Sequence, residues 1–304
     1  FLKHKIKKKV FFIDNLDEKK LKNLKSQKNS TTLFLIISKS GNTDETILNL
    51  YFFNSFLKRQ NTIIISENKN NFLRNLAKKK NFHYVEHKKF IGGRYSVLSE
   101  VGMLPAYLMG LKIKDFKKSL RGLLYNKKLL LNYVNTLKKL KIKNTKILVL
   151  FSYIPELNDF LYWSQQLFAE SLGKKKRGFL PVISNAPKDH HSLLQLYLDG
   201  PKDKIFYIFS TDRVGNLKTK LNFFDENMSH LKKKQYNDLK ISQKNAFVSI
   251  LKSKKILFRE IKIKKFNEET IGKLFLQFVI ETIFLGGVFK INPFDQPAVE
   301  LIKK

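Results

Sequence analysis

Short apolar runs alternate with longer amphipathic stretches along most of the chain. The short runs, which are bounded by polar residues, are typical of buried strands, and we expect strands at residues 10–13, 33–37, 62–66, 147–151, 204–210 and 256–263. Amphipathic spacing predicts helices at residues 44–58, 72–80, 97–111, 113–140, 157–172, 238–252 and 268–284. Strands that alternate with helices in this way favour parallel sheets with crossover helices, which is an α/β fold.

The alternation is interrupted in the middle of the chain. It breaks around Gly92 and Gly93 and resumes at residue 147, and a lysine-rich, largely helical stretch lies between these points. Two α/β units joined by helices therefore fit the chain better than one continuous sheet. Residues 212–237 are polar and weakly patterned, and we assign no element to them.

The chain is strongly basic, with a formal net charge of +34 over 304 residues. Such a balance could supply phosphate contacts to a nucleic acid. However, only seven of the 59 basic residues are arginine, which is the residue that favours base readout and bidentate phosphate binding. Lysine, asparagine, isoleucine and phenylalanine are abundant together, and AT-rich codons encode all four. We therefore attribute the charge to codon bias, expect no nucleic-acid partner, and interpret Lys174, Lys175 and Lys176 as mostly solvated surface.

The composition narrows the class of protein further. The absence of cysteine excludes disulfides and thiolate metal sites. The first residues lack the pattern of a signal peptide, and no apolar run reaches the roughly 18 to 20 residues that span a bilayer. We therefore expect a soluble cytoplasmic protein with no membrane partner. The initial Phe1, in place of a methionine, suggests a fragment.

Hydroxyl side chains gather where the strand at residues 33–37 meets the next helix. Ser38, Ser40 and Thr43 supply hydroxyls, Lys39 supplies a cation, and Gly41 lets the backbone approach a ligand. Ligands of α/β sheets bind at the carboxyl ends of strands, and a helix N-terminus attracts a phosphate. The turn lacks the Gly-Lys-Ser/Thr ending of a nucleotide P-loop, which favours a phosphate monoester. An ordinary helix N-cap at Thr43 explains the stretch alone equally well.

Five segments of the chain, in order, resemble the glucose-6-phosphate isomerase family. "SKSGNTDET" from Ser38 resembles the phosphate loop of the family, although this fragment also resembles other sugar isomerase (SIS) domains. The other four segments are "GGRYSVLSEVGMLP" from Gly92, "AESLGK" from Ala169, "DHHSLLQLYLDGP" from Asp189 and "NPFDQPAVELIK" from Asn292. The segments are spread from residue 38 to residue 303, so the resemblance extends along nearly the whole chain. Ile302 stands where the family commonly has a glycine.

The resemblance implies an α/β fold of two SIS-type αβα sandwich domains with mostly parallel sheets. The first domain would comprise residues 1–112 and would be incomplete at its amino terminus, because the family carries a Gly-Gly-Ser loop upstream of the first matching segment. Residues 113–285 would form the second domain. Residues 286–304 would be a carboxyl-terminal segment that completes the active site.

The resemblance also implies an activity, the reversible aldose–ketose isomerisation of glucose 6-phosphate and fructose 6-phosphate through a cis-enediol, in glycolysis and gluconeogenesis. Carbon acids are weak, so the reaction needs a well-placed base and a stabilised enediolate. Glu170 aligns with the base of the family, and Arg94 would stabilise charge on the enediolate oxygens. The substrate phosphate would be bound by Ser38, Lys39, Ser40 and Thr43, and the rest of the substrate by Gly93 and Gln296.

His191 aligns with the ring-opening histidine of the family, and Lys303 would assist ring opening. In the family the enzyme is a two-fold dimer whose histidine enters each site from the neighbouring subunit, so we expect a homodimer that shares His191. His190 is the competing residue if the alignment slips by one position. The resemblance implies no cofactor and no metal. The remaining histidines are interpreted as surface or core residues: His4, His83, His87 and His230.

Two alternatives concern the same fold. A non-catalytic sugar-phosphate-binding SIS-domain protein would keep the phosphate loop and could lose the base, but the presence of Glu170, Arg94 and His191 together argues against it. A side activity on mannose 6-phosphate stays open, because the stereochemistry at C2 depends on the fine shape of the pocket.

Overall fold

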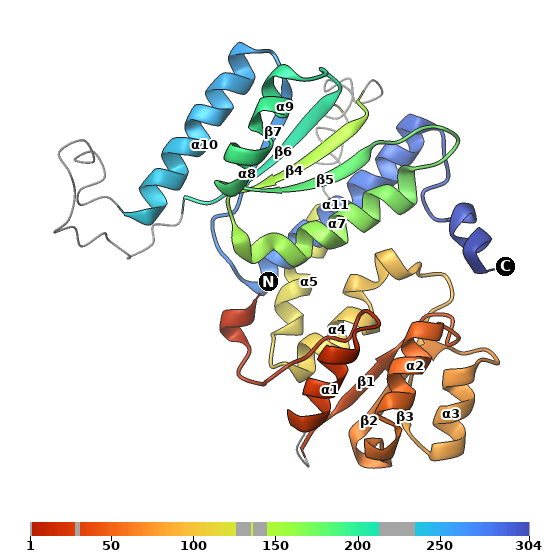
Figure 1. Ribbon diagram of the computed structural model, residues 1–304. Coiled ribbons are helices and arrows are strands. Elements are labelled where there is room, and N and C mark those ends of the chain that lie inside the picture. The colour runs from red at the N-terminus through yellow and green to blue at the C-terminus, as the bar shows by residue number, and fades with distance from the viewer. Residues whose placement is uncertain (1, 28–30, 126–134, 136–144, 213–234, 304) are drawn as a thin grey trace. The chain divides into compact units, whose positions relative to one another are not determined.

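The computed structural model describes residues 2–27, 31–125, 135, 145–212 and 235–303. The chain divides into two compact units, an amino-terminal unit (Lys3–Ile113) and a carboxyl-terminal unit (Lys114–Lys304), to which Leu2 also belongs. Each unit is built around its own sheet, and every strand pair in the described residues is parallel (Figure 1). The expected α/β fold with parallel sheets is therefore confirmed.

The amino-terminal unit contains a three-stranded sheet in the order β1-β2-β3. Its strands are β1 (Phe34–Ile37), β2 (Thr62–Glu67) and β3 (His83–His87). Its helices are α1 (Glu18–Gln27), α2 (Asp44–Phe52), α3 (Phe72–Lys80) and α4 (Glu100–Leu108), with short 3-10 helices η1 (Lys3–Lys5), η2 (Asn54–Phe56), η3 (Arg59–Asn61) and η4 (Gly93–Leu98). The core between this sheet and its helices is formed by Ile36, Leu50, Ile64, Leu73, Ala77 and Phe82.

Two expectations for this unit are wrong. Residues 10–13, expected as a buried strand, are irregular and exposed, and 63% of Phe12 is accessible to solvent. So short an apolar run has no periodicity that separates a strand from a loop, and β1 pairs with β2 alone among the described strands. The helix expected at residues 44–58 ends at Phe52, because Asn54 and Ser55 compete for backbone hydrogen bonds and favour turns.

The carboxyl-terminal unit contains a four-stranded sheet in the order β5-β4-β6-β7. Its strands are β4 (Ile147–Ser152), β5 (Leu180–Asn185), β6 (Lys204–Ser210) and β7 (Leu257–Lys262). Helices α7 (Asn158–Leu172) and α11 (Glu268–Phe289) lie side by side on one face (Figure 1). The other face carries α8 (Lys188–Ser192), α9 (Leu194–Asp199) and α10 (Tyr236–Ser253). The remaining elements are α5 (Ile113–Tyr125), η6 (Pro155–Leu157) and η8 (Pro297–Lys303).

Parts of two stretches considered in the sequence cannot be compared with the structure. The helix expected at residues 113–140 is observed as α5 up to Tyr125, and residues 126–134 and 136–140 lie outside the described residues. Most of the unassigned stretch 212–237 also lies outside them, and α10 begins near its end, at Tyr236.

Strands β3 and β5 were not expected from the sequence. Both are edge strands of their sheets. An edge strand tolerates polar residues and proline, because one side of its backbone makes no ladder hydrogen bonds. β3 carries His83, Glu86 and His87, and β5 carries Pro181, so neither shows the continuous apolar run of the central strands.

Helix α11 is the core helix of the carboxyl-terminal unit. Among the described residues it is the one helix long and apolar enough to cross a membrane by length and composition. Its Phe275, Phe278 and Leu285 are buried, and the Phe278 ring meets the Phe160 ring of α7 edge to face at 5.0 Å between centroids. This burial against α7 and the sheet makes α11 a core helix of the unit.

A charged residue, Glu281, lies in this core with none of its surface exposed. Its Oε2 accepts a hydrogen bond from Arg259 Nη2 of β7 at 2.6 Å, and its Oε1 accepts one from the Tyr207 hydroxyl of β6. The Arg259 guanidinium also lies over the Tyr207 ring, 3.7 Å from its centroid. A buried carboxylate is tolerated only when an opposite charge and hydrogen bonds compensate its lost hydration. Because the partners of Glu281 come from β6 and β7, the network ties α11 to both strands.

We predict that Glu281→Gln lowers the free energy of unfolding by about 3 to 5 kcal/mol, because the buried Arg259 charge loses its opposite charge. The loss would be measured by urea unfolding. The matched control is Glu156→Gln, at an exposed position of the same unit, which should stay within about 0.5 kcal/mol of the parent. Equal losses in the two variants would contradict a structural role for this network.

Candidate active site

Three hydroxyls meet in the turn between β1 and α2. Ser38 Oγ lies 2.6 Å from Thr43 Oγ1, and Ser40 Oγ lies 3.5 Å from Ser38 Oγ and 3.4 Å from Thr43 Oγ1. The turn follows the carboxyl end of β1, where parallel α/β sheets bind ligands. The structure therefore brings together the three hydroxyl residues that the sequence assigns to phosphate binding.

The geometry of Thr43 bears on the choice between a phosphate site and an ordinary helix cap. Thr43 is the N-cap of α2 by its backbone, but its side chain makes no capping hydrogen bond. Its hydroxyl is turned toward Ser38 instead. The first-turn N–H groups of α2 are thus without a Thr43 cap, and such groups together with the helix dipole attract anions. This arrangement favours the phosphate site over the simple cap.

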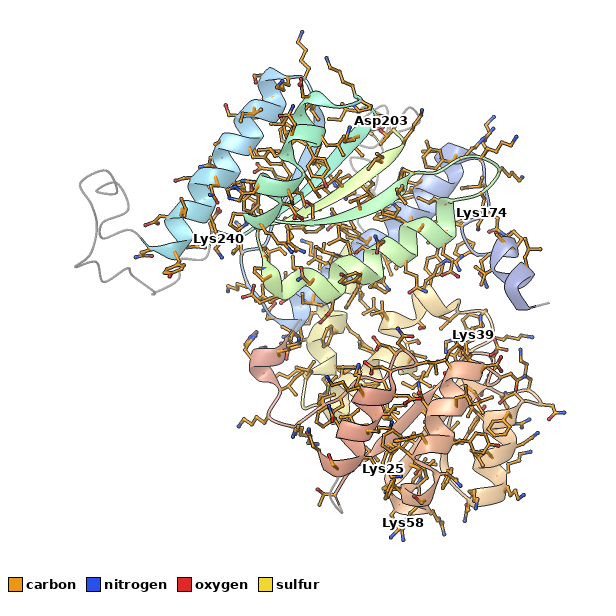
Figure 2. All side chains as sticks on the ribbon, viewed as in Figure 1. Lys25, Lys39, Lys58, Lys174, Asp203 and Lys240 are labelled. Atoms are coloured by element: carbon orange, nitrogen blue, oxygen red, sulfur yellow. The ribbon has the colours of Figure 1, made fainter. Side chains whose placement is uncertain are left out.

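Lys39 brings its charge to the same turn (Figure 2). Its Nζ lies 3.6 Å from Glu67 Oε1 and 3.4 Å from the carbonyl oxygen of Lys89. Burial acts to raise the pKa of Glu67, but Lys69, at 2.7 Å, and Lys39 outweigh it and hold that pKa below its usual value. Glu67 therefore stays ionised and positions Lys39, whose side chain is partly exposed at the turn.

Gly41 is required by the turn itself. Its φ is +71°, in the region that favours glycine, and its N–H donates to Ser38 Oγ at 3.2 Å. A Cβ at this position would lie 2.0 Å from Asn71 Oδ1. Asn71 is itself fixed as the N-cap of α3, where it accepts a hydrogen bond from Arg74 N. The glycine thus lets the hydroxyl turn approach the start of α3, a contact that the sequence does not reveal.

Arg94 and Gly93 lie in η4 in contrasting surroundings. Arg94 is 2% exposed, and its guanidinium carbon lies 5.2 Å from the centroid of the Tyr95 ring. Gly93 is exposed, and a Cβ built on it would meet nothing within 4 Å. Ser96 Oγ donates to the Gly93 carbonyl oxygen at 2.6 Å and closes the turn. Consecutive residues thus supply an open backbone edge, at Gly93, and a buried charged side chain, at Arg94.

His87 holds the chain on both sides of Gly93 and Arg94, a role that the sequence did not reveal. It is 1% exposed, at the end of β3. Its Nδ1 lies 2.5 Å from Glu100 Oε1, at the start of α4, and its Nε2 lies 3.1 Å from the Ile91 carbonyl oxygen. One side chain therefore holds residues before and after Gly93 and Arg94. His87 is one of the four histidines interpreted as surface or core residues, and it is a core residue.

Glu170 and His191 lie at opposite edges of the sheet in the carboxyl-terminal unit. β4 and β5 are parallel, with Ile147 opposite Leu180, so α7 between them must run back from the carboxyl edge to the amino edge. Glu170, near the end of α7, is therefore at the amino edge, where it accepts a hydrogen bond from Gln166 Nε2 at 3.2 Å. His191 follows the carboxyl end of β5. The length of α7, about 22 Å, separates the two edges.

Asp189 anchors α8, the short helix that carries His191. Its carboxylate accepts hydrogen bonds from Asn185 N at 2.7 Å, Ser184 Oγ at 2.9 Å and Ser192 Oγ at 3.0 Å. Partial burial acts to raise the pKa of Asp189, but these hydrogen bonds hold it below its usual value. The ionised carboxylate thus ties both ends of α8 to the end of β5.

The structure distinguishes His190 from His191. His190 Nε2 lies 2.8 Å from the Tyr153 hydroxyl, and its ring stacks on Phe151 at 5.5 Å between centroids. Burial, and then the neighbouring charge of His191, lower the pKa of His190. His191 is exposed. The His190 ring is held by core aromatic contacts and the His191 ring is exposed, which favours His191 as the predicted substrate-facing residue.

The carboxyl-terminal segment meets the loop after α7. Lys174 Nζ lies 2.5 Å from the Asn292 carbonyl oxygen and 2.5 Å from Asp295 Oδ1. Only 11% of the Lys174 side chain is exposed, so the expectation that it is solvated surface is wrong for this lysine. Gln296 follows directly and is half-buried. The side chain of Lys303, at the end of η8, lies outside the described residues.

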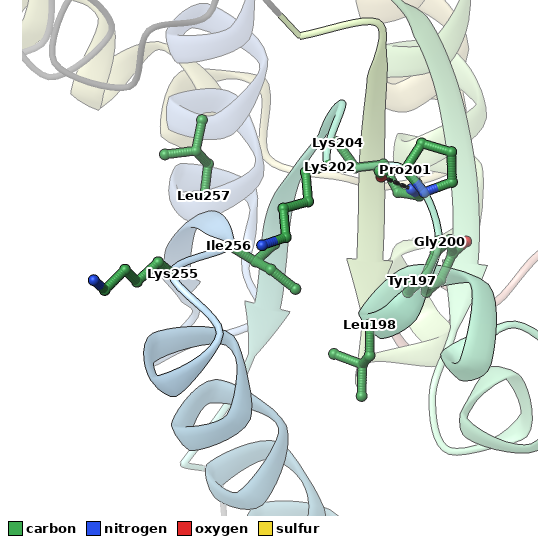
Figure 3. A pocket seen from close by; sticks show the side chains of 9 residues that line it. All are labelled: Tyr197, Leu198, Gly200, Pro201, Lys202, Lys204, Lys255, Ile256 and Leu257. Atoms are coloured by element: carbon green, nitrogen blue, oxygen red, sulfur yellow. Dashed lines mark hydrogen bonds between the residues drawn. The ribbon is translucent and has the colours of Figure 1, made fainter.

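A separate hollow of about 50 Å³ lies where β6 and β7 begin, on the face of α9 and α10 (Figure 3). It is smaller than the roughly 300 to 1,000 Å³ of ordinary ligand pockets. Of the three lysines that line it, Lys204 is bonded to the Pro201 carbonyl oxygen and to Asp203 Oδ1. None of the candidate site residues lines it, so we assign it no ligand. In the described part of the chain, no three His, Asp or Glu side chains are grouped as metal ligands.

Comparison with known proteins places the chain in a family. Residues 1–304 match the model of the family described as phosphoglucose isomerase. The chain is 35% identical to a probable glucose-6-phosphate isomerase of Methanococcus maripaludis, over 97% of this chain and 70% of the relative. It is 34% identical to the glucose-6-phosphate isomerase of Methanocaldococcus jannaschii, over 97% of this chain and 76% of the relative. The chain therefore belongs to the phosphoglucose isomerase family.

Solved structures with a similar fold agree with this family assignment. A hypothetical protein of Thermus thermophilus superposes with a TM-score of 0.84 at 26% identity, covering 96% of this chain and 75% of that protein. A glucose-6-phosphate isomerase of Chlamydia trachomatis superposes with a TM-score of 0.77 at 19% identity, covering 98% and 63%. The family membership and the fold inferred from the five sequence segments are confirmed, and the roles of individual residues stay predictions.

We predict that Gly41→Ala and Gly93→Ala differ in their effects on stability. Gly41→Ala combines a strained φ with a clash against Asn71 and should cost about 1 to 3 kcal/mol of unfolding free energy. Gly93→Ala places its methyl group in open space and should leave stability unchanged. Both would be measured by urea unfolding, and a larger loss for Gly93→Ala would refute the geometry of these two turns.

Proposed function

We propose that the protein catalyses the reversible isomerisation of glucose 6-phosphate and fructose 6-phosphate, within glycolysis and gluconeogenesis. The observation that carries the proposal is the cluster of Ser38, Ser40 and Thr43 hydroxyls at the start of α2, in a chain of the phosphoglucose isomerase family. Three hydroxyl donors and a helix N-terminus suit the three terminal oxygens of a phosphate monoester. Lys39 would add one positive charge.

The proton transfer would be carried out by Glu170. A single carboxylate takes the proton from C2 of the open-chain aldose and returns it to C1, which converts the aldose to the ketose through a cis-enediol. The negative charge that develops on the enediolate oxygens needs a fixed positive group, and the guanidinium of Arg94 is the group we assign. Gly93, with its unobstructed backbone, would lie against the substrate.

Ring opening would precede this step and use other residues. The cyclic sugar opens when a proton leaves its anomeric hydroxyl and another reaches the ring oxygen. We assign this transfer to His191, with assistance from Lys303, and we assign substrate binding near the carboxyl-terminal segment to Gln296. Imidazole suits the task because its ordinary pKa lies near neutrality.

We infer that the active protein is a homodimer in which each site combines Glu170 of one subunit with His191 of the other. The support is the topology of the carboxyl-terminal unit, where α7 carries Glu170 to the amino edge of the sheet and β5 leads His191 to the carboxyl edge. In a dimer with a two-fold axis every interface contact occurs twice, so each of the two sites can receive one His191 from the other subunit. The exposure of His191 on α8 fits this role. We place this soluble homodimer in the cytoplasm.

We predict that Glu170→Gln nearly abolishes isomerisation and leaves the binding of a sugar-phosphate inhibitor largely intact, because it removes a proton acceptor and keeps shape and polarity. The double variant Lys39→Ala, Ser40→Ala should weaken inhibitor binding instead. Turnover would be followed in a coupled dehydrogenase assay and binding by calorimetry. A Glu170→Gln variant that keeps most of the parent rate would rule out this base.

We predict that Glu170→Gln and His191→Ala subunits complement each other. After the two inactive variants are mixed, unfolded and refolded, about half of the dimers should be mixed by random pairing. In each mixed dimer one site receives both defects and the other none, so roughly a quarter of all sites should regain activity on cyclic substrate. Each variant refolded alone is the control. Activity that stays at the level of these controls would exclude a site shared between subunits.

A further inference from the structure

The loop after α7 is tied to the chain that follows α11 at two points. Lys174, which is labelled in Figure 2, binds through its Nζ the carbonyl oxygens of Asn292 and Asp295 and the Asp295 carboxylate. Arg177 Nη1 donates to the carbonyl oxygen of Phe289, the last residue of α11. Carbonyls at the carboxyl end of a helix lack intrahelical partners and attract cations. Lys174 and Arg177 therefore supply donors to carbonyl oxygens at the end of α11 and in the segment that follows it.

Lys174 is the more specific of the two ties. Its ammonium group donates three hydrogen bonds, and the three acceptors reach it from two residues of one short segment. The Lys174 side chain is largely buried, whereas the Asp295 side chain is 53% exposed. Lys174 holds the pKa of Asp295 below its usual value through this contact. The position of residues 292–295 is thus set by a side chain from another part of the chain.

This tie joins two candidate site residues that are far apart in sequence. Glu170 lies four positions before Lys174, in the last turn of α7, and Gln296 directly follows Asp295. We propose that Lys174 is a positioning residue that docks residues 292–296 against the end of α7, so that Gln296 meets the substrate on which Glu170 acts. The inference rests on the proposed isomerase function and adds a role that Lys174 performs without touching the substrate.

Lys176 provides a matched control for this role. It lies in the same loop and has the same side chain, but it is exposed. A general loss of positive charge near the site would affect Lys174→Met and Lys176→Met alike. A positioning role would affect Lys174→Met alone, and Lys174→Arg should restore much of the loss, because a guanidinium keeps the charge and several donors.

The test combines activity with a readout of docking that does not depend on activity. In Lys174→Met, amide hydrogen exchange in the segment after α11 should become faster, while exchange in the strands stays as in the parent. We expect kcat/KM for isomerisation to fall by about 10- to 100-fold, because misplacement of a substrate-binding group by about 1 Å costs up to this much. Asp295→Ala, which removes one acceptor and leaves both carbonyls, should show a smaller change in the same direction.

A double-mutant cycle separates positioning from a general structural effect. If Lys174 acts through Gln296, then Lys174→Met should have little further effect on kcat/KM in a Gln296→Ala background. Independent, multiplied losses would overturn the proposal, and so would equal losses in Lys174→Met and Lys176→Met or unchanged exchange in the segment. Activity of the parent enzyme distinguishes failure of the positioning role from failure of the proposed function. A parent without isomerase activity would refute the function, and the exchange measurement would still test the contact between Lys174 and residues 292–295.

Discussion

The arrangement of the candidate site depends on the direction of α7. Two parallel neighbouring strands require a crossover that returns from the carboxyl edge of the sheet to the amino edge, and α7 is that crossover between β4 and β5. Glu170 at its end and His191 after β5 are therefore held at opposite edges by topology, not by the choice of side chains. No rotamer change spans a separation of about 22 Å. The proposed dimer satisfies this constraint, because it would take Glu170 from one copy of the chain and His191 from the other.

A second constraint governs the hydroxyl turn in the amino-terminal unit. The turn brings Ser38, Ser40 and Thr43 together only because Gly41 adopts a positive φ and leaves room for Asn71. The side chain of Thr43 is turned away from the N–H groups that an N-cap threonine ordinarily satisfies. The three hydroxyls contact one another and lie beside N–H groups of α2 that the Thr43 side chain does not cap. An anion bound here would accept hydrogen bonds from both.

Sequence patterns were sufficient where a residue's role is local and insufficient where it depends on a distant partner. The central strands β2, β4 and β6 are continuous apolar runs and were predicted, whereas the edge strands β3 and β5 mix polar residues and proline and were missed. The hydroxyl turn was recognisable because its residues are adjacent. Lys174 was misjudged because its partners lie more than a hundred positions away, and a lysine beside two other lysines has no local sign of burial.

The residues that the sequence missed share one physical task. An exposed side chain such as that of His191 is not held by core packing, so its position has to be set by neighbours that point inward. His87 holds the two ends of the segment with Gly93 and Arg94, and His190 and Asp189 hold the helix that presents His191. These anchors are buried or partly buried and make specific hydrogen bonds. A substitution at an anchor should therefore act on catalysis through geometry, which is why exchange rates and double-mutant cycles, more than single activities, reveal what such residues do.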